Sequence, residues 1–282
     1  MSTTSNASPG RNPRSHQERC ASAAETFRRF VPEAEPERVA ASFSRRLGPL
    51  GTFAFEAVGD MWNRPGLARR DRSLMIVSLL ATQARGEELI AHTQIGVRHG
   101  LTRTEIEEIL PMVAAYAGFP AAMAASREID EGLRLIEGVE QLSPRTRAAA
   151  KSDAERERDA ARVRAALTGL PEQDPVQDLA ELTFKLGDLG GLTYRWTLGE
   201  IWARPELSLR DRSIVVISIL TALVAEQMLP EYIEGGLRNG LRREEIEEML
   251  THLGLYAGLA HAAAAMLVAK AVFDTLAEGE SP

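Results

Sequence analysis

The sequence predicts an all-α fold built from two tandem copies of one helical unit. Ala, Leu, Glu and Arg dominate the chain, and the alternation of β-branched residues that marks strands is scarce. A shift of 140 residues aligns 61–120 with 201–260 at 24 identities in 60 positions. Average residue usage would give about one identity in fifteen positions, so the two segments are copies of each other.

Four residue strings keep this spacing without a gap. They are Trp62 and Trp202, each followed by Arg-Pro at 64–65 and 204–205; Arg-Asp-Arg-Ser at 70–73 and 210–213; Glu-Ile-Glu-Glu at 105–108 and 245–248; and Tyr-Ala-Gly at 116–118 and 256–258.

Each copy should contain a buried central helix followed by three further helices. In the first copy these helices are expected over 70–81, 86–98, 102–116 and 121–136. The apolar residues of the first segment are too continuous for a surface helix. Gly100 provides a C-terminal stop for the second helix. Thr102 stands three residues before Glu105, which is the spacing of a capping box at the start of the third.

Composition divides the chain into four parts. They are a disordered N-terminal tail (1–25), a first repeat (26–140), a charged helical linker (141–175) and a second, degenerate repeat (176–282). The tail is rich in Ser, Asn, Pro, Gly and Arg, with no apolar run like that of a secretory signal. The charges of the linker nearly cancel, which favours a solvated connecting helix over a ligand site.

Charge and cysteine content exclude several classes of protein. The net charge is −7, from 33 basic and 40 acidic residues, so no nucleic-acid partner is expected. The longest apolar stretch, around 214–225, is too short for a membrane span. Cys20 is the single cysteine, so no internal disulfide or cysteine-rich metal site can form. We therefore expect a cytoplasmic protein without a metal.

The strings above, together with Trp62-Asn-Arg-Pro-Gly-Leu and Arg85, Glu88 and His92, resemble the carboxymuconolactone decarboxylase family. The resemblance covers about 50–137 and 190–276. It implies an alkylhydroperoxidase-D-type helical fold, with the two copies paired through their central helices about a pseudo-twofold axis. Family members usually form trimers or hexamers, so we expect a homo-oligomer, most simply a trimer of this duplicated chain.

The resemblance also implies decarboxylation of a small carboxylated lactone or oxo acid without a metal or organic cofactor. A second branch of this fold reduces peroxides with a Cys-x-x-Cys pair. That chemistry needs an attacking thiolate and a resolving thiol. Because Cys20 is the only thiol, the sequence excludes a thiol peroxidase.

Arg85, Glu88 and His92 form the candidate catalytic set of the first repeat. On a helix they fall within a sector of about 60°, so they share one face. A guanidinium can hold a carboxylate, an imidazole can donate or relay a proton, and a carboxylate can fix the imidazole tautomer. The alternative is an ordinary surface ion pair beside a packed histidine. In the second repeat the equivalent positions are Ala225, Met228 and Tyr232, so that copy should have lost this chemistry.

Three further residues are candidates for contact with the substrate. Arg72 recurs as Arg212, and an ion pair that supports the fold is favoured over a substrate contact. Trp62 is favoured as a core residue, although the family places this segment near its pocket. His252 replaces Met112 of the first repeat and could complete a composite site.

Two other functions stay open from the sequence. The same residues could serve a specialised cyclase, isomerase or lactone-opening enzyme of a biosynthetic pathway. A non-catalytic oligomeric binding or scaffold protein is the alternative from a different class. Side chains that point to solvent rather than line a pocket would favour the binding protein.

Overall fold

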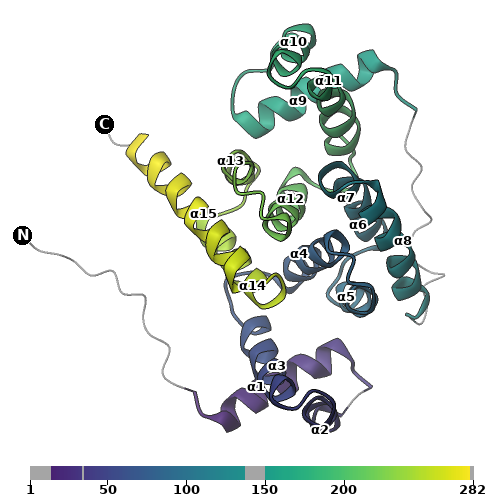
Figure 1. Ribbon diagram of the computed structural model, residues 1–282, viewed down its shortest axis with the longest axis vertical. Helices are drawn as coiled ribbons and strands as arrows, with labels where there is room; N and C mark the ends of the chain where they lie inside the picture. The colour runs from purple at the N-terminus through teal and green to yellow at the C-terminus, as the bar shows by residue number, and fades with distance from the viewer. Residues whose placement is uncertain (1–13, 34, 137–149, 280–282) are drawn as a thin grey trace, which may run out of the picture. The chain divides into compact units, whose positions relative to one another are not determined.

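The computed structural model describes residues 14–33, 35–136 and 150–279, and the regular elements in those ranges are all helices (Figure 1). This confirms the all-α prediction. Residues 1–13 of the expected tail and 137–149, which include the start of the expected linker, lie outside the described residues. The chain divides into two compact units, Met1–Arg64 and Pro65–Pro282.

The first unit consists of three helices around a small aromatic core. These are α1 (His16–Phe30), α2 (Pro36–Leu47) and α3 (Pro49–Trp62). The Phe27 ring stacks on Phe55 at 5.1 Å and lies 5.6 Å from Phe43, and Phe30 lies edge-on to Trp62 at 4.9 Å. Each of the three helices therefore contributes at least one aromatic ring to the core of this unit.

The structure corrects the predicted N-terminal tail, because α1 begins at His16. Ser15 and Glu18 form a capping box, which satisfies backbone donors at the start of the helix. The polar composition before residue 25 conceals one buried stripe, Ala23, Thr26, Phe27 and Phe30. Tertiary burial of that stripe against α3 favours the helix more than local composition opposes it.

The second unit opens with the remaining helices of the first repeat. They are α4 (Arg69–Thr82), α5 (Gly86–Arg98), α6 (Arg103–Glu107), α7 (Ile109–Ala117) and α8 (Phe119–Arg134). Thr102 and Glu105 form the predicted capping box, and Gly100 has a φ of +97° after α5. The predicted third helix is divided at Glu108 into α6 and α7.

The second repeat contains matching helices. They are α9 (Asp153–Thr168), α10 (Pro175–Leu186), α11 (Asp188–Leu192), the π-helical segment η2 (Thr193–Trp202), α12 (Leu209–Leu223), α13 (Leu229–Arg238), α14 (Arg243–Tyr256) and α15 (Leu259–Gly279). The central helices α4 and α12 pack against each other (Figure 1).

Reciprocal ion pairs show the pseudo-twofold relation of the two repeats within the second unit. Arg70 of α4 donates to Asp211 of α12 at 2.9 Å, and Arg210 of α12 pairs with Asp71 of α4 at 2.9 Å. Likewise α14 packs on α4 while α7 packs on α12. The predicted pairing of the two copies is therefore confirmed.

The structure also corrects the charged linker, because α9 packs as part of the second repeat. Ala160, Ala161, Val163 and Leu167 are buried, and α9 lies along η2 and α13. In the first unit, α1 lies along α3 in the same way. The second repeat thus begins near Ser152, and α9 is its first helix rather than a connector. Its charged residues cover the outer face and mask the short apolar stripe in the sequence.

Two glycines mark the same helix crossing in both repeats. A Cβ on Gly59 would lie 2.4 Å from the Ala23 Cα, and one on Gly199 would lie 2.1 Å from the Arg156 carbonyl oxygen. The offset between equivalent residues changes from 139 at Gly51 and Gly190 to 140 beyond them. The second repeat therefore has one extra residue between Gly190 and Gly199, where η2 begins. The wider turn of a π-helix accommodates this residue, so Trp202 keeps the place equivalent to Trp62.

The C-terminal helix α15 has the length and apolar composition of a membrane span. It packs instead within the second unit, against α14 and α13, through its buried residues Ala262, Ala265, Ala269, Val272 and Phe273. That packing buries 28% of the apolar window, and Leu259 and Leu267 stay exposed.

Candidate active site at the junction of the repeats

A buried arginine of the first repeat is held by two residues of the second. Arg72 on α4 is 0% exposed and donates from Nη2 to Glu248 Oε1 at 2.8 Å and from Nη1 to His252 Nδ1 at 2.7 Å. Its Nε donates to the Leu67 carbonyl at 3.2 Å. An arginine only donates, so His252 Nδ1 is the acceptor and a neutral His252 carries its proton on Nε2. The structure shows the ion pair that the sequence favoured for Arg72.

Three rings continue from this pair toward the first repeat. His252 and Tyr256 both lie on α14 and stack in parallel at 5.7 Å, with an interplanar angle of 6°. His92 on α5 meets the same tyrosine ring edge-on at 5.1 Å. Tyr256 therefore contacts both imidazoles. We name Arg72, His92, Glu248, His252 and Tyr256 the junction cluster.

His92 is neutral at physiological pH in this environment. Burial and the nearby His99 lower the pKa of His92 to about 3. His99 is itself held by a hydrogen bond between its Nδ1 and Ser73 Oγ at 2.8 Å. His92 as a residue is half-buried with its Nδ1 buried, whereas His252 is fully buried. Of the two histidines, His92 is the less buried.

Two residues of the candidate catalytic set, Arg85 and Glu88, are not members of the junction cluster. Glu88 lies on α5 one turn before His92, and Arg85 is the N-cap residue of that helix; both are exposed. Trp62 belongs to the first unit, where it is 2% exposed and packs against Phe30. Three predicted site residues, Arg72, His92 and His252, do belong to the junction cluster.

Sequence reasoning missed Glu248 and Tyr256. Both belong to strings that recur in the two repeats, Glu-Ile-Glu-Glu and Tyr-Ala-Gly, and were recognised there only as markers of duplication. A recurring buried arginine requires a nearby acid, and the recurring Glu was the available signal.

The pseudo-equivalent position, related by the 140-residue offset, has a different lining. Arg212 donates to Glu108 at 2.9 Å and to the Arg204 carbonyl at 2.8 Å, but Met112 stands where His252 stands at the junction cluster. The Nε and Nη1 atoms of Arg212 are buried, and no described residue accepts a hydrogen bond from them. Arg204 forms a second ion pair with Glu108 at 2.6 Å.

Aromatic side chains contact one another at this second position, which we name the closed junction: Tyr116, Trp202 and Tyr232, with Arg212, Glu108 and Met112. Trp202 Nε1 donates to the Tyr116 hydroxyl at 2.8 Å, and the Tyr116 hydroxyl lies 2.8 Å from that of Tyr232. Tyr232 replaces His92 and is 7% exposed. Burial raises the pKa of Tyr232 to about 12 and that of Tyr116 well above its usual value, so both phenols stay neutral.

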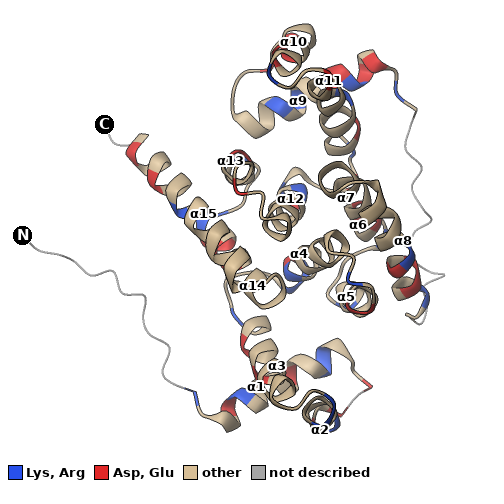
Figure 2. Cartoon of the chain, viewed as in Figure 1, with Lys and Arg blue, Asp and Glu red and all other residues tan. Residues whose placement is uncertain are grey.

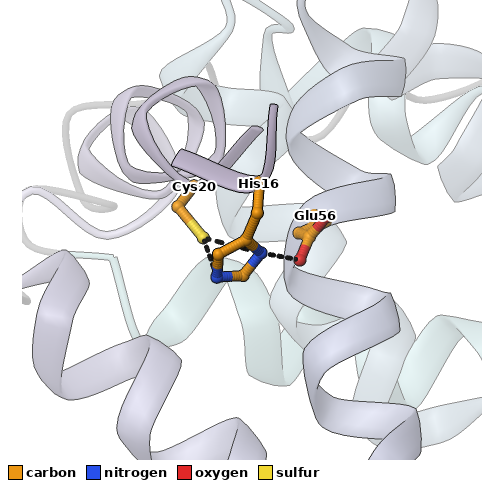
Figure 3. A group of neighbouring side chains, drawn as sticks. All are labelled: His16, Cys20 and Glu56. Carbon is orange, nitrogen blue, oxygen red and sulfur yellow. Dashed lines mark hydrogen bonds and ion pairs between the residues drawn. The ribbon is translucent and has the colours of Figure 1, made fainter. Parts of the chain in front are cut away.

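One group of potential metal ligands lies in the first unit (Figure 3). His16 Nδ1 is 2.7 Å from Glu56 Oε1, and Cys20 Sγ is 3.6 and 3.9 Å from the two ring nitrogens of His16. A sulfur at similar distances from both nitrogens does not lie along the lone pair of either. His16 is largely exposed and joined to Glu56 by a hydrogen bond, which explains their proximity as a surface contact.

Comparison with known proteins identifies relatives of both repeats. The profile described as "Carboxymuconolactone decarboxylase family" matches residues 53–131 and 189–271. The 4-carboxymuconolactone decarboxylase of Acinetobacter baylyi is 38% identical over 89 residues, which cover 32% of this chain and 66% of that protein. The nitrosuccinic acid decarboxylase npaB of Metarhizium robertsii is 39% identical over 69 residues, which cover 24% of this chain and 48% of that protein. The chain thus spans slightly under two thirds of the first relative and about half of the second.

Proposed function

The chain belongs to the carboxymuconolactone decarboxylase family, and on that premise we propose that it decarboxylates a small carboxylated acid with His92 as its acid-base group. The observation that carries the proposal is the half-buried His92, whose ring meets Tyr256 edge-on while Tyr256 stacks on His252 of the buried Arg72–His252 pair. Both matched relatives are named as decarboxylases, which supports the reaction type.

The names of the two relatives define a class of substrate. One acts on a carboxylated lactone and the other on a dicarboxylic acid with a nitro group. Each acid carries an electron-withdrawing group that can accept the electron pair left when the bond to the carboxylate breaks. A substrate of this class supplies its own electron acceptor, so the proposed reaction needs no organic cofactor.

The protein then has to hold the acid and manage one proton. The bond from carbon to the carboxylate breaks, CO₂ leaves, the electron pair moves into the electron-withdrawing group, and a proton is added at carbon. The low pKa of His92 means that the imidazole is neutral before substrate binds. Negative charge that develops beside it raises its proton affinity, so His92 can take a proton from solvent and transfer it to carbon.

Arg85 and Glu88 lie at the N-terminal end of α5, before His92 in sequence. Their exposure allows Arg85 to attract the substrate carboxylate and Glu88 to exchange protons with water. Exposure also lowers the contribution expected from each, because water screens both charges. In this proposal they assist a reaction whose proton is moved by His92.

The exposure of Glu88 and Arg85 is also the observation that favours the alternative, a non-catalytic binding protein. Such a protein would bind a small acid without releasing CO₂. A specialised isomerase or lactone-opening enzyme would change the substrate without releasing CO₂. Product analysis therefore separates all three functions.

The test is CO₂ release from 4-carboxymuconolactone and from 2-nitrosuccinate, with the products identified by NMR spectroscopy. Wild-type protein should release one CO₂ per acid consumed from a substrate of this class, and His92→Ala should be slower by about 10² to 10⁴. Tyr232→Phe changes the equivalent position of the other repeat and should keep wild-type turnover. Rapid turnover by His92→Ala would reject the proposal.

A further inference from the structure

The two repeats differ at two positions that decide what each junction contains. Arginine, glutamate and tyrosine are kept in both repeats, as Arg72 and Arg212, Glu108 and Glu248, Tyr116 and Tyr256. The first repeat has His92 and Met112, whereas the second has Tyr232 and His252. At these two positions each repeat therefore has one histidine, and the histidine stands at a different position in each.

The pseudo-twofold packing brings these two histidines together. The junction cluster combines α4 and α5 of the first repeat with α14 of the second. The closed junction combines the equivalent helices, α12 and α13 of the second repeat with α7 of the first. His92 on α5 and His252 on α14 consequently both contact the Tyr256 ring, although they are 160 residues apart in sequence. The closed junction receives Tyr232 and Met112 and contains neither histidine.

The tyrosine pair of the closed junction is held by contacts between its own rings. Tyr116 and Tyr232 lie edge-on at 5.5 Å, with their hydroxyl groups hydrogen-bonded, and Trp202 stacks on Tyr232 at 6.0 Å. A hydrogen-bonded group of neutral aromatic residues stabilises the fold by burial and offers no acid-base group near neutral pH.

We propose that the repeats have specialised in opposite directions, so that each chain has one catalytic centre, completed by His252 of the second repeat as a positioning residue. The inference rests on the proposed function for its chemistry. The second repeat is then not a degenerate copy that only supports the fold. It supplies Tyr256 together with Glu248 and His252, which hold the tyrosine ring next to His92.

The contacts of His252 explain how it positions the Tyr256 ring. Its Nδ1 is fixed by Arg72, whose charge is balanced by Glu248, and its ring plane lies parallel to Tyr256. Tyr256 in turn meets His92 edge-on. Since His252 is 0% exposed, it acts on the substrate only through these neighbours. Small changes in position at such a site can lower turnover by about 10²-fold.

The chain provides its own evidence that methionine fits beside this arginine. Met112 occupies the equivalent place next to Arg212 and is fully buried. His252→Met should therefore fold, while it removes the acceptor for Arg72 Nη1. His252→Asn keeps an oxygen that can accept the same hydrogen bond. Met112→Leu is the matched control in the closed junction.

The experiment measures turnover and ligand binding on the full chain. With a substrate that the wild type decarboxylates, His252→Met should lower kcat by 10-fold to 100-fold, with a smaller change in KM and a displaced pH profile. His252→Asn should recover part of the loss, and Met112→Leu should match the wild type. An unchanged kcat and pH profile in a folded His252→Met protein would overturn the positioning role.

Calorimetric titration with succinate tests the number of sites independently of any turnover. Succinate is a dicarboxylate without an electron-withdrawing group beyond its carboxyl groups, so it reports binding alone. We expect one succinate per chain, with shifts in the NMR signals of His92. Two equivalents per chain would overturn the single-centre inference. One equivalent without CO₂ release from any acid would instead reject the proposed function and leave the single centre in place.

Discussion

Replacement of His92 by Asn should flatten the pH dependence of folding stability between pH 7.5 and 5. The pKa of His92 is about 3 in the folded chain and about 6.5 in an unfolded chain. Above pH 6.5 the imidazole is neutral in both states and contributes no pH dependence. Below pH 6.5 the unfolded chain binds a proton that the folded chain does not, so stability falls as pH falls toward 3.

The magnitude follows from the two pKa values. Each pKa unit corresponds to about 1.36 kcal/mol, so the free energy of unfolding should fall by about 2 kcal/mol between pH 7.5 and 5 through this group. That is an upper value, since His92 as a residue is only half-buried and nearby water reduces the effect of burial. Asn removes the titration and keeps a small polar side chain.

The assay is urea unfolding at pH 7.5 and 5.0 for three proteins. Wild type and Tyr232→Phe should lose up to about 2 kcal/mol more than His92→Asn on acidification. Tyr232 is the matched control because its pKa of about 12 keeps it neutral over this range. Equal losses for His92→Asn and wild type would refute the assignment of a buried, neutral imidazole.

Three other changes have distinct expected outcomes. Glu88→Gln should lower kcat less than His92→Ala and alter the pH profile, and Arg85→Ala should mainly raise KM; steady-state kinetics with the identified substrate would show whether either change is silent. Cys20→Ser should retain full turnover, because the thiol has no second cysteine to react with; a large loss in a folded variant would contradict this. Gly199→Ala should destabilise the second repeat by more than about 1 kcal/mol, because its Cβ would lie 2.1 Å from the Arg156 carbonyl oxygen; an unchanged urea midpoint would show that α9 does not cross η2 this closely.

The helices of the duplicated core could be predicted from sequence because their signals are local. The continuous apolar run predicts the buried α4, and the Thr102 and Glu105 spacing predicts the start of α6. The break at Glu108 was missed although its cause is local. Pro111 has no N–H to bond the Glu107 carbonyl, whereas the second repeat has Thr251 at this position and α14 runs unbroken.

The ends of the repeats were misjudged for a related reason. The helices α1 and α9 bury only a narrow stripe, such as Phe27 and Phe30 in α1, among many charged residues. Composition averages over the whole segment and conceals a stripe of this kind. The matching close contacts of Gly59 and Gly199 identify the two helices as equivalent once the structure is known.

The junction cluster could be anticipated only in part. His92 was identified from its spacing on a helix, and His252 from its contrast with Met112. Their proximity depends on how α5 and α14 pack, which no single-helix pattern encodes. Figure 2 shows charged residues distributed over many helices, so charge alone does not select this junction.

The central claim is that His92 moves the proton in a decarboxylation, and chemical rescue tests it most directly. His92→Ala leaves space where the imidazole stood, so added imidazole can take its place in the acid-base step. The account predicts that CO₂ release by His92→Ala is slow and rises with imidazole concentration, while wild type and Tyr232→Phe do not respond. Wild-type CO₂ release by His92→Ala without added imidazole would contradict it.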